Sequence, residues 1–167
     1  MTQQWPEPVE RVAAFLRAAG AEARLEEFTE DTPTAEDAAS AVGCGLAQIV
    51  KSVVFECDGR PVVVMVPGDR RASPRNVARA AGTRRARIAG PELVRSATGF
   101  EPGAVAPFPL PKVDLVLIDR SLLAHEQVWV GAGSPHHLAS LAPSELVRLA
   151  RAQPVDAAEA GGARGVK

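Results

Sequence analysis

Apolar residues recur along this chain with two different periods, and each period predicts a different kind of element. Residues 9–16 place apolar side chains three and four positions apart, which predicts a helix that begins near Pro8 and stops at Gly20. Residues 48–55 and 62–66 are β-type runs, and the turn formed by Asp58 and Gly59 between them predicts a hairpin. The pattern therefore indicates both helices and sheet.

The remaining pattern switches between short helices and short strands. Helices are expected where a capping residue or a proline opens a segment that ends at glycine, at residues 34–43, 73–82 and 90–99, and a last helix from about residue 143. Strands are expected at residues 113–118, 126–130 and about 137–141. Because groups of helices separate the strand runs, the pattern predicts one α+β domain on a mixed or largely antiparallel sheet flanked by helices.

The domain is expected to fill residues 1–155. At 167 residues, the chain is long enough for one sizeable core and short for two domains. Residues 156–167 are rich in alanine and glycine, which predicts a flexible tail.

Lys51 interrupts the first β-type run. In strand alternation Ile49, Val53 and Phe55 share its face, so a charge falls among apolar side chains. Such a lysine must extend to solvent, find an anion or point into a polar cavity, because an unpaired buried ammonium is costly. The cavity interpretation makes Lys51 a candidate functional residue, and the alternative is a lysine that protects a sheet edge.

The charge balance excludes a generally basic nucleic-acid binder, because the formal net charge is -1. Positive charge is nevertheless concentrated in one segment, which contains Arg70, Arg71, Arg75, Arg79, Arg84, Arg85 and Arg87. This segment suits weak phosphate contacts, and the alternative is a solvated helical face.

Cysteine and histidine patterns predict no metal or other cofactor. Cys44 and Cys57 lack the CxxC spacing of a zinc or redox site and are expected to be reduced. The histidines at positions 125, 136 and 137 form no recognised ligand spacing. The chain shows neither a signal-peptide pattern nor an apolar run of membrane-spanning length, so we expect a soluble cytoplasmic protein with no membrane partner.

Two loops stand out for their glycine and proline content. Residues 98–109 contain too many prolines for regular structure and too many apolar residues for a solvated linker, which predicts a packed loop. Residues 131–137 place small residues where backbone N–H groups can meet a phosphate or carbonyl oxygen. The alternative for the second loop is a tight turn, with His136 and His137 on the surface.

In their order and spacing, these segments resemble the YbaK/EbsC family of aminoacyl-tRNA deacylases, which also occurs as the editing insertion of bacterial prolyl-tRNA synthetases. The resemblance covers roughly residues 34–149. It rests on Thr34-Ala-Glu-Asp-Ala-Ala, Gln48-Ile-Val-Lys-Ser, Val66-Pro-Gly-Asp69, Thr98-Gly-Phe100 with the Pro-Gly-Ala loop, Ile118-Asp-Arg-Ser-Leu-Leu123, Gly131-Ala-Gly133 and Leu141-Ala-Pro143.

The resemblance implies a barrel-like sheet and a trans-editing hydrolase that removes a wrongly attached amino acid from the 3′ end of tRNA. It makes Lys51 the functional lysine, with catalysis largely assisted by the substrate's own hydroxyl or a positioned water. The residues that it implies for substrate binding are Ser52, Thr98, Gly99, Gly103, Ala104, Gly131, Gly133, Ser134 and His136. An aminoacyl-tRNA synthetase is a further implied partner.

Two departures from the family pattern leave the substrate open. Ala104 stands where the family has a second glycine, and its methyl group narrows the pocket. Residues 134–138 lack the acidic residue found in members that resemble cysteinyl-tRNA-Pro deacylases. Alanine, serine, cysteine and proline-like substrates all remain candidates. The alternatives to a deacylase are a non-catalytic aminoacyl-tRNA-binding module that acts with a synthetase, and an esterase for small esters.

Overall fold

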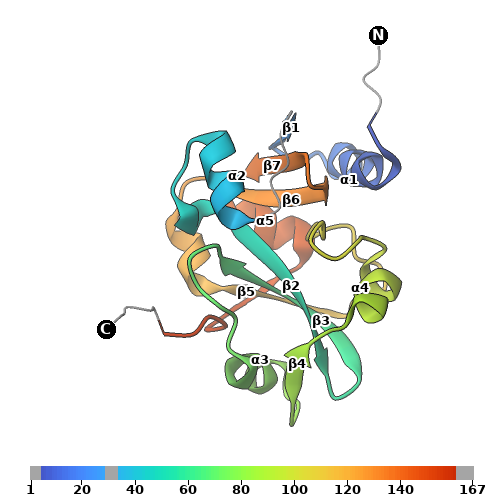
Figure 1. Ribbon diagram of the computed structural model, residues 1–167, viewed down its shortest axis with the longest axis vertical. Coiled ribbons are helices and arrows are strands. Elements are labelled where there is room, and N and C mark those ends of the chain that lie inside the picture. Colours follow the sequence, from blue (N-terminus) through green and yellow to red (C-terminus); the bar gives the residue numbers. More distant parts are fainter. Residues whose placement is uncertain (1–4, 29–33, 161–167) are drawn as a thin grey trace.

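Two β-sheets with helices around them organise the chain in the computed structural model, which describes residues 5–28 and 34–160 (Figure 1). In chain order the elements are α1 (Glu7–Ala18), β1 (Ala23–Glu27), α2 (Ala35–Val42), η1 (Leu46–Gln48), β2 (Val50–Cys57), β3 (Arg60–Pro67), α3 (Pro74–Ala81), β4 (Ala86–Ile88), α4 (Pro91–Thr98), β5 (Leu115–Asp119), η2 (Arg120–Ala124), β6 (Val128–Ser134), β7 (His137–Leu141), α5 (Pro143–Ala150) and β8 (Gln153–Val155). The helices η1 and η2 are 3-10 helices.

The helices begin and end where the sequence predicts. The Thr34 side chain caps α2 by accepting a hydrogen bond from the Asp37 backbone N–H at 3.1 Å. Ser73 caps α3 in the same way, because its hydroxyl accepts from the Asn76 N–H at 3.1 Å. Proline occupies the first turn of α1, α3, α4 and α5, where its missing N–H costs no helical hydrogen bond.

The larger sheet has five strands in the order β4-β2-β3-β5-β8. β2 and β3 form the expected antiparallel hairpin, whereas β3 pairs with β5 and β5 with β8 in parallel. The smaller sheet, β1-β7-β6, is antiparallel throughout. The α+β prediction with a mixed sheet is therefore confirmed. The barrel-like shape is corrected, since the described strands form two open sheets that do not close into a barrel.

The two faces of β2 enter different apolar clusters. Val50 and Val54 belong to the main core, while Phe55 packs with Val64 and Val77 in a second cluster beneath α3. Lys51 alternates with Phe55 and pairs with Val66, a member of the second cluster. The predicted placement of a lysine on an apolar face is therefore confirmed.

The sequence analysis does not predict three of the strands, β1, β4 and β8, and each of them lies at a sheet edge. β1 is largely charged, β4 is three residues long within the arginine segment, and β8 contains Pro154. Edge strands need only one hydrogen-bonding partner and carry little apolar periodicity. Their pairing to distant strands therefore leaves no local signal.

The segment after β8 is tied to the larger sheet. Ala157 and Ala158 are buried, and their N–H groups each donate to the Asp119 carboxylate at 2.8 Å. Of the predicted tail, residues 156–160 thus continue the packed structure, and residues 161–167 lie outside the described residues. Within the described ranges, no helix combines the length and apolarity needed to cross a membrane.

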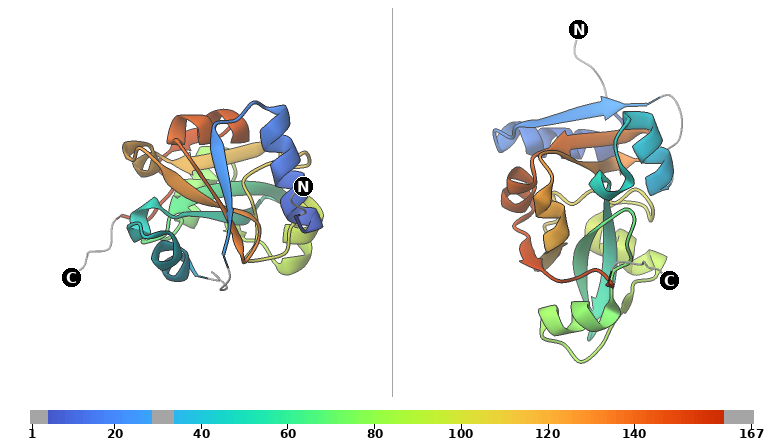
Figure 2. Two further views of the ribbon diagram at one scale, coloured as in Figure 1. Left: turned by 90° about the horizontal axis from the view of Figure 1, so that it is seen from above. Right: turned by 90° about the vertical axis from the view of Figure 1, so that its left-hand side faces the viewer.

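The molecule has two distinct ends along its longest axis. Figure 1 and the right view of Figure 2 place α1, β1 and the smaller sheet at one end, and α3, β4 and the tip of the β2–β3 hairpin at the other. A parallel bridge between Ile49 and Trp129 joins the two sheets just before Lys51. The start of β2 consequently lies at the junction of the sheets.

Candidate functional site

A pocket of about 440 Å³ opens at this junction. Its walls come from the start of α2, the first residues of β2, the loop after α4 and the β6–β7 turn. The predicted site residues that line it are Lys51, Ser52, Gly103, Ala104, Gly131 and Ser134. The structure therefore brings together residues from four separate parts of the chain, and we refer to this space as the Lys51 pocket.

Lys51 is half-buried and has no salt bridge within the described part of the chain. Burial lowers the pKa of Lys51, and the positive charge of Arg71 adds to the decrease, while Glu36 and Asp69 oppose it. A second pocket of about 450 Å³ shares Glu36 and Lys51 with the first and is also lined by Arg71. The ammonium group thus stands at a boundary between two open spaces, where it can meet an anion.

Ser52 contributes a hydroxyl whose bonding capacity is unused. Its Oγ atom is buried and has no hydrogen-bond partner among the described residues. Buried polar groups are nearly always hydrogen-bonded in native proteins, and an unsatisfied one is costly unless it serves a ligand. Because Ser52 lines the Lys51 pocket, this hydroxyl is available to a bound molecule.

The loop after α4 forms one wall of the pocket. Gly103 adopts φ +85°, a conformation that residues with a Cβ atom rarely accept, and Ala104 beside it is 7% exposed. A Cβ atom on Gly131 would lie 3.0 Å from the Val105 carbonyl oxygen. Glycine at position 131 therefore allows β6 to approach this loop closely, which closes the pocket wall.

Four predicted site residues do not line the pocket. Thr98 is buried, and its hydroxyl donates to the Val94 carbonyl at 2.6 Å and accepts from the Phe100 N–H at 3.0 Å. The Gly99 carbonyl accepts a hydrogen bond from Arg11 of α1 at 3.1 Å. These two residues therefore fix the loop that carries Gly103 and do not contact the pocket.

The other two predicted site residues outside the pocket, Gly133 and His136, lie near the β6–β7 turn. A Cβ atom on Gly133 would lie 2.9 Å from the Pro8 carbonyl oxygen, so Gly133 packs against the start of α1. The His136 N–H donates to Ser134 Oγ at 3.0 Å, and the His136 carbonyl accepts from the Phe28 N–H at 2.8 Å. His136 thus acts on the site through the turn that positions Ser134.

His137 begins β7, as the strand prediction for residues 137–141 expects, but it is not on the surface, where the alternative interpretation of the loop puts it. It is 2% exposed, and its Nδ1 atom lies 2.5 Å from Ser134 Oγ. Its Nε2 atom has no hydrogen-bond partner in the described residues and lies 3.7 Å from Glu27 Oε2. A proton on Nε2 faces this carboxylate and leaves Nδ1 as an acceptor for the Ser134 hydroxyl.

Burial lowers the pKa of His137, which favours the neutral form of its imidazole ring. The Trp5 ring contacts His137 edge-on at 5.3 Å between centroids, which shields it from water. Glu27 is 110 positions from His137 in the chain and meets it only through the β1–β7 pairing. No local pattern could have shown this arrangement.

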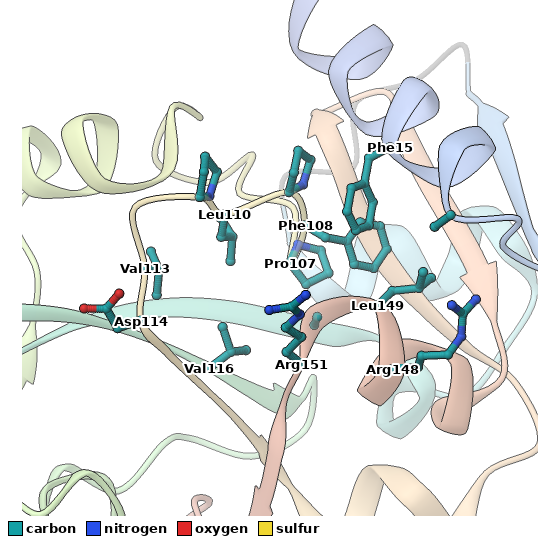
Figure 3. Close-up of a pocket in the computed structure, with 14 residues that line it drawn as sticks. Phe15, Pro107, Phe108, Leu110, Val113, Asp114, Val116, Arg148, Leu149 and Arg151 are labelled. Carbon is teal, nitrogen blue, oxygen red and sulfur yellow. The ribbon is translucent and has the colours of Figure 1, made fainter.

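A different cavity, of about 660 Å³, lies away from all the predicted site residues. It is formed by the end of α1, residues 107–116 and the end of α5, and Figure 3 shows its side chains. Phe15 and Phe108 stack within it at 5.4 Å between ring centroids. Its walls combine apolar side chains with the charged groups of Asp114, Arg148 and Arg151. Its described lining contains no lysine and no unsatisfied hydroxyl, so its chemistry suits hydrolysis less well than that of the Lys51 pocket.

Residues 29–149 match the family model of the aminoacyl-tRNA editing domain. The uncharacterized protein YwhH of Bacillus subtilis (strain 168) is 34% identical over 121 residues, which cover 72% of this chain and 76% of YwhH. A proline--tRNA ligase of Xanthomonas oryzae pv. oryzae (strain MAFF 311018) is 32% identical over 127 residues. That match covers 74% of this chain but only 22% of the ligase.

Solved structures give the same result for the fold. A crystal structure of a candidate trans-editing enzyme for prolyl tRNA synthetase superposes with a TM-score of 0.87 at 34% identity, covering 94% of this chain and all of that one. The hypothetical protein APE2540 superposes with a TM-score of 0.83 at 31% identity, covering 89% of this chain and 99% of that one. The resemblance drawn from the sequence is therefore confirmed.

Proposed function

The chain belongs to the aminoacyl-tRNA editing domain family, and from this premise we propose that it is a hydrolase that releases a small, wrongly attached amino acid from the 3′ end of tRNA. The observation that carries the proposal is the Lys51 pocket. It combines a lysine without a salt bridge, an unsatisfied serine hydroxyl and a close-packed glycine loop in one concave space.

The reaction is the addition of water across an ester bond. The Lys51 ammonium holds a phosphate or ester oxygen near the 3′ end of the RNA by charge-assisted hydrogen bonding. A ribose hydroxyl of the substrate positions the attacking water, the bond between the carbonyl carbon and the ribose oxygen breaks, and the ribose oxygen takes up a proton. The Gly103 backbone N–H stabilises the negative charge that develops on the carbonyl oxygen. The Ala104 N–H donates to the Glu101 carbonyl at 2.9 Å and holds this loop in place.

The pocket walls favour a small amino acid such as cysteine, alanine or serine. The Ala104 methyl group lines the pocket, and Gly131 lies against the Val105 carbonyl, so neither wall can withdraw without backbone movement. Ser134 adds a hydroxyl whose orientation His137 controls. A difference of one methylene in such a pocket is worth about 1–3 kcal/mol, which is enough to rank these substrates.

The partner in this proposal is the 3′ end of an aminoacyl-tRNA, and a synthetase is the source of the mischarged molecule. Because aminoacyl-tRNAs are made and used in the cytoplasm, we place the reaction there. Co-purification with prolyl-tRNA synthetase tests whether the two proteins also form a complex.

The test is release of labelled amino acid from tRNAs charged with alanine, serine, cysteine or proline. Native protein is compared with Lys51→Ala and with Lys112→Ala, a control at an exposed lysine outside the pocket. Hydrolysis of one charged tRNA that is lost only in Lys51→Ala supports the proposal and identifies the substrate. Retention of aminoacyl-tRNA without hydrolysis would instead favour the non-catalytic binding module.

A further inference from the structure

The elements α3 and β4 lie at one end of the molecule (Figure 1), and the segment that contains them is rich in arginine. Residues 70–87 contain seven of the 19 basic residues of the chain and no aspartate or glutamate. Because the chain as a whole has a net charge of -1, this segment makes the charge distribution strongly uneven.

Several of these arginines keep their charge free for a partner. Arg75 and Arg79 are four positions apart on α3, share one helical face and are exposed. Within the described ranges, neither has a salt bridge, whereas Arg87 is paired with Glu56 at 2.6 Å. The helix therefore presents two unpaired guanidinium groups to solvent.

Arg84 and Arg85 extend this surface beside α3. Their backbone N–H groups donate to the Asp58 carboxylate at 2.9 and 3.1 Å, which fixes the turn before β4. Their side chains have no salt bridge in the described part of the chain. A pocket of about 670 Å³ is lined by both residues and by Arg75, so the two groups of arginines adjoin one another.

Arg71 connects this segment to the Lys51 pocket, across a space whose walls also carry Glu36, Asp69 and Glu159. Arg71 and Lys51 line the same neighbouring pocket, and the charge of Arg71 contributes to lowering the pKa of Lys51. At the far end, Cys57 of β2 pairs with Ala86 of β4. Cys57 is six positions after Lys51 in β2, which is a distance of about 20 Å at roughly 3.3 Å per residue.

We propose that Arg71, Arg75, Arg79, Arg84 and Arg85, here called the arginine surface, dock the phosphate backbone of an RNA duplex whose single-stranded end enters the Lys51 pocket. The inference rests on the proposed function and assigns the part of the molecule that binds the body of the tRNA. A length of about 20 Å spans several base pairs of an A-form RNA helix.

The composition of the arginine surface favours a duplex over a single strand. Proteins that bind single strands stack bases on aromatic side chains, and residues 70–87 contain no phenylalanine, tryptophan or tyrosine. Guanidinium groups without aromatic neighbours contact phosphates and carry no base specificity. The surface therefore supplies affinity and orientation, while the pocket supplies the chemistry.

The experiment compares two double variants with the same change in net charge. Arg75→Glu with Arg79→Glu reverses the charge on α3. Arg17→Glu with Arg24→Glu does the same at the opposite end, where these side chains are 64% and 81% exposed. Binding of uncharged tRNA is measured by fluorescence anisotropy from 50 to 200 mM salt, and deacylation is measured on charged tRNA and on the aminoacyl ester of adenosine.

We expect the α3 variant to bind tRNA about tenfold more weakly at low salt, and the control variant to bind like native protein. Each lost phosphate contact should reduce the slope of log K against log salt by about 0.9 or less. The α3 variant should have a raised KM on charged tRNA and unchanged kinetics on the adenosine ester, because that ester does not reach the arginine surface. Arg84→Glu with Arg85→Glu should reproduce the effect at a second position.

An equal loss of tRNA affinity in the two double variants would overturn the proposal, as would unchanged tRNA binding in the α3 variant. So would native protein that binds vesicles of anionic phospholipid but no tRNA. Failure of the proposed function would give a different result, because native protein would then hydrolyse neither the charged tRNA nor the adenosine ester. The tRNA-binding measurement would still decide the role of the arginine surface.

Discussion

Lys51 and Asp119 are charged residues in the same five-stranded sheet, and they differ in how many partners they have within the protein. Asp119, at the end of β5, is 4% exposed and accepts hydrogen bonds from the N–H groups of Ala157 and Ala158 and from the N–H and hydroxyl of Ser121. Lys51, at the start of β2, is half-buried and has no salt bridge among the described residues.

Under the proposed function, the difference separates a structural charge, Asp119, from a functional one, Lys51. Burial alone raises the pKa of Asp119, but the hydrogen bonds from Ser121, Ala158 and Ala157 outweigh it and lower the pKa below the ordinary value. Both oxygens of Asp119 have partners within the protein: Oδ1 joins residues 157–158 to β5, and Oδ2 accepts from Ser121 and lies 3.7 Å from Arg70. Among the described residues, by contrast, Lys51 has no salt bridge and the Ser52 hydroxyl has no hydrogen-bond partner, which is why we propose that both bind substrate.

The sharpest test of this contrast is Lys51→Met, which removes the charge and keeps the length of the side chain. We expect kcat/KM for deacylation to fall by about 100-fold or more, because the positive charge acts where negative charge develops. The free energy of unfolding should change by less than about 1 kcal/mol, since no salt bridge is lost. A large loss of stability in urea titrations would contradict the functional assignment.

Asp119→Asn should reduce stability and leave activity nearly unchanged, the reverse of the result expected for Lys51→Met. The amide keeps one acceptor oxygen, so donors at Ser121 or at residues 157–158 lose their partner, and we expect a loss of about 2–3 kcal/mol in the free energy of unfolding. Asp114→Asn, at an exposed aspartate, is the control and should change stability by less than about 0.5 kcal/mol.

Acid pH tests the same carboxylate without mutation. Because the pKa of Asp119 is lowered in the folded state, its contribution is complete above the unfolded-state value of about 3.9 and is lost as the pH falls through the folded value. Urea titrations of native protein should therefore show a component below pH 4 that Asp119→Asn lacks. Activity of the variant at low temperature and neutral pH should match that of native protein.

Ala104→Gly tests the wall of the Lys51 pocket. Removing the methyl group restores the glycine pair of the family and enlarges the pocket. We expect the ratio of kcat/KM for a larger to a smaller amino acid to rise by about tenfold, within the range of one methylene. Charged tRNAs carrying alanine and proline provide the measurement, and an unchanged ratio would show that another group sets the size limit.

His137 should give the smallest effect, and one that depends on pH. Its pKa is lowered in the folded protein, so the unfolded chain binds a proton first as the pH falls below about 6.5, and stability decreases from there toward the folded value. His137→Gln should remove this part of the pH dependence between pH 7.5 and 5, whereas His125→Gln, at the partly exposed end of η2, should retain it. An identical pH profile for native protein and His137→Gln would rule out the buried neutral ring as its source.

The sequence predicts the parts of this molecule that have local causes. Thr34 and Ser73 cap helices through bonds three residues away, and Lys51 is conspicuous because it breaks an apolar run in its own strand. Ser52 and His137 gave no such signal. Whether a buried polar atom is satisfied depends on partners distant in the chain, as Glu27 is from His137.

The Lys51 pocket draws its walls from residues 34 to 138, and the strand at its edge, β7, also pairs with β1, where Ala23 meets Leu141. Pairing across such a long stretch of chain is slow compared with helix formation. During synthesis on the ribosome, the pocket cannot exist until most of the polypeptide has emerged. If the protein has the proposed function, half-made chains therefore cannot hydrolyse the aminoacyl-tRNAs that surround the ribosome producing them.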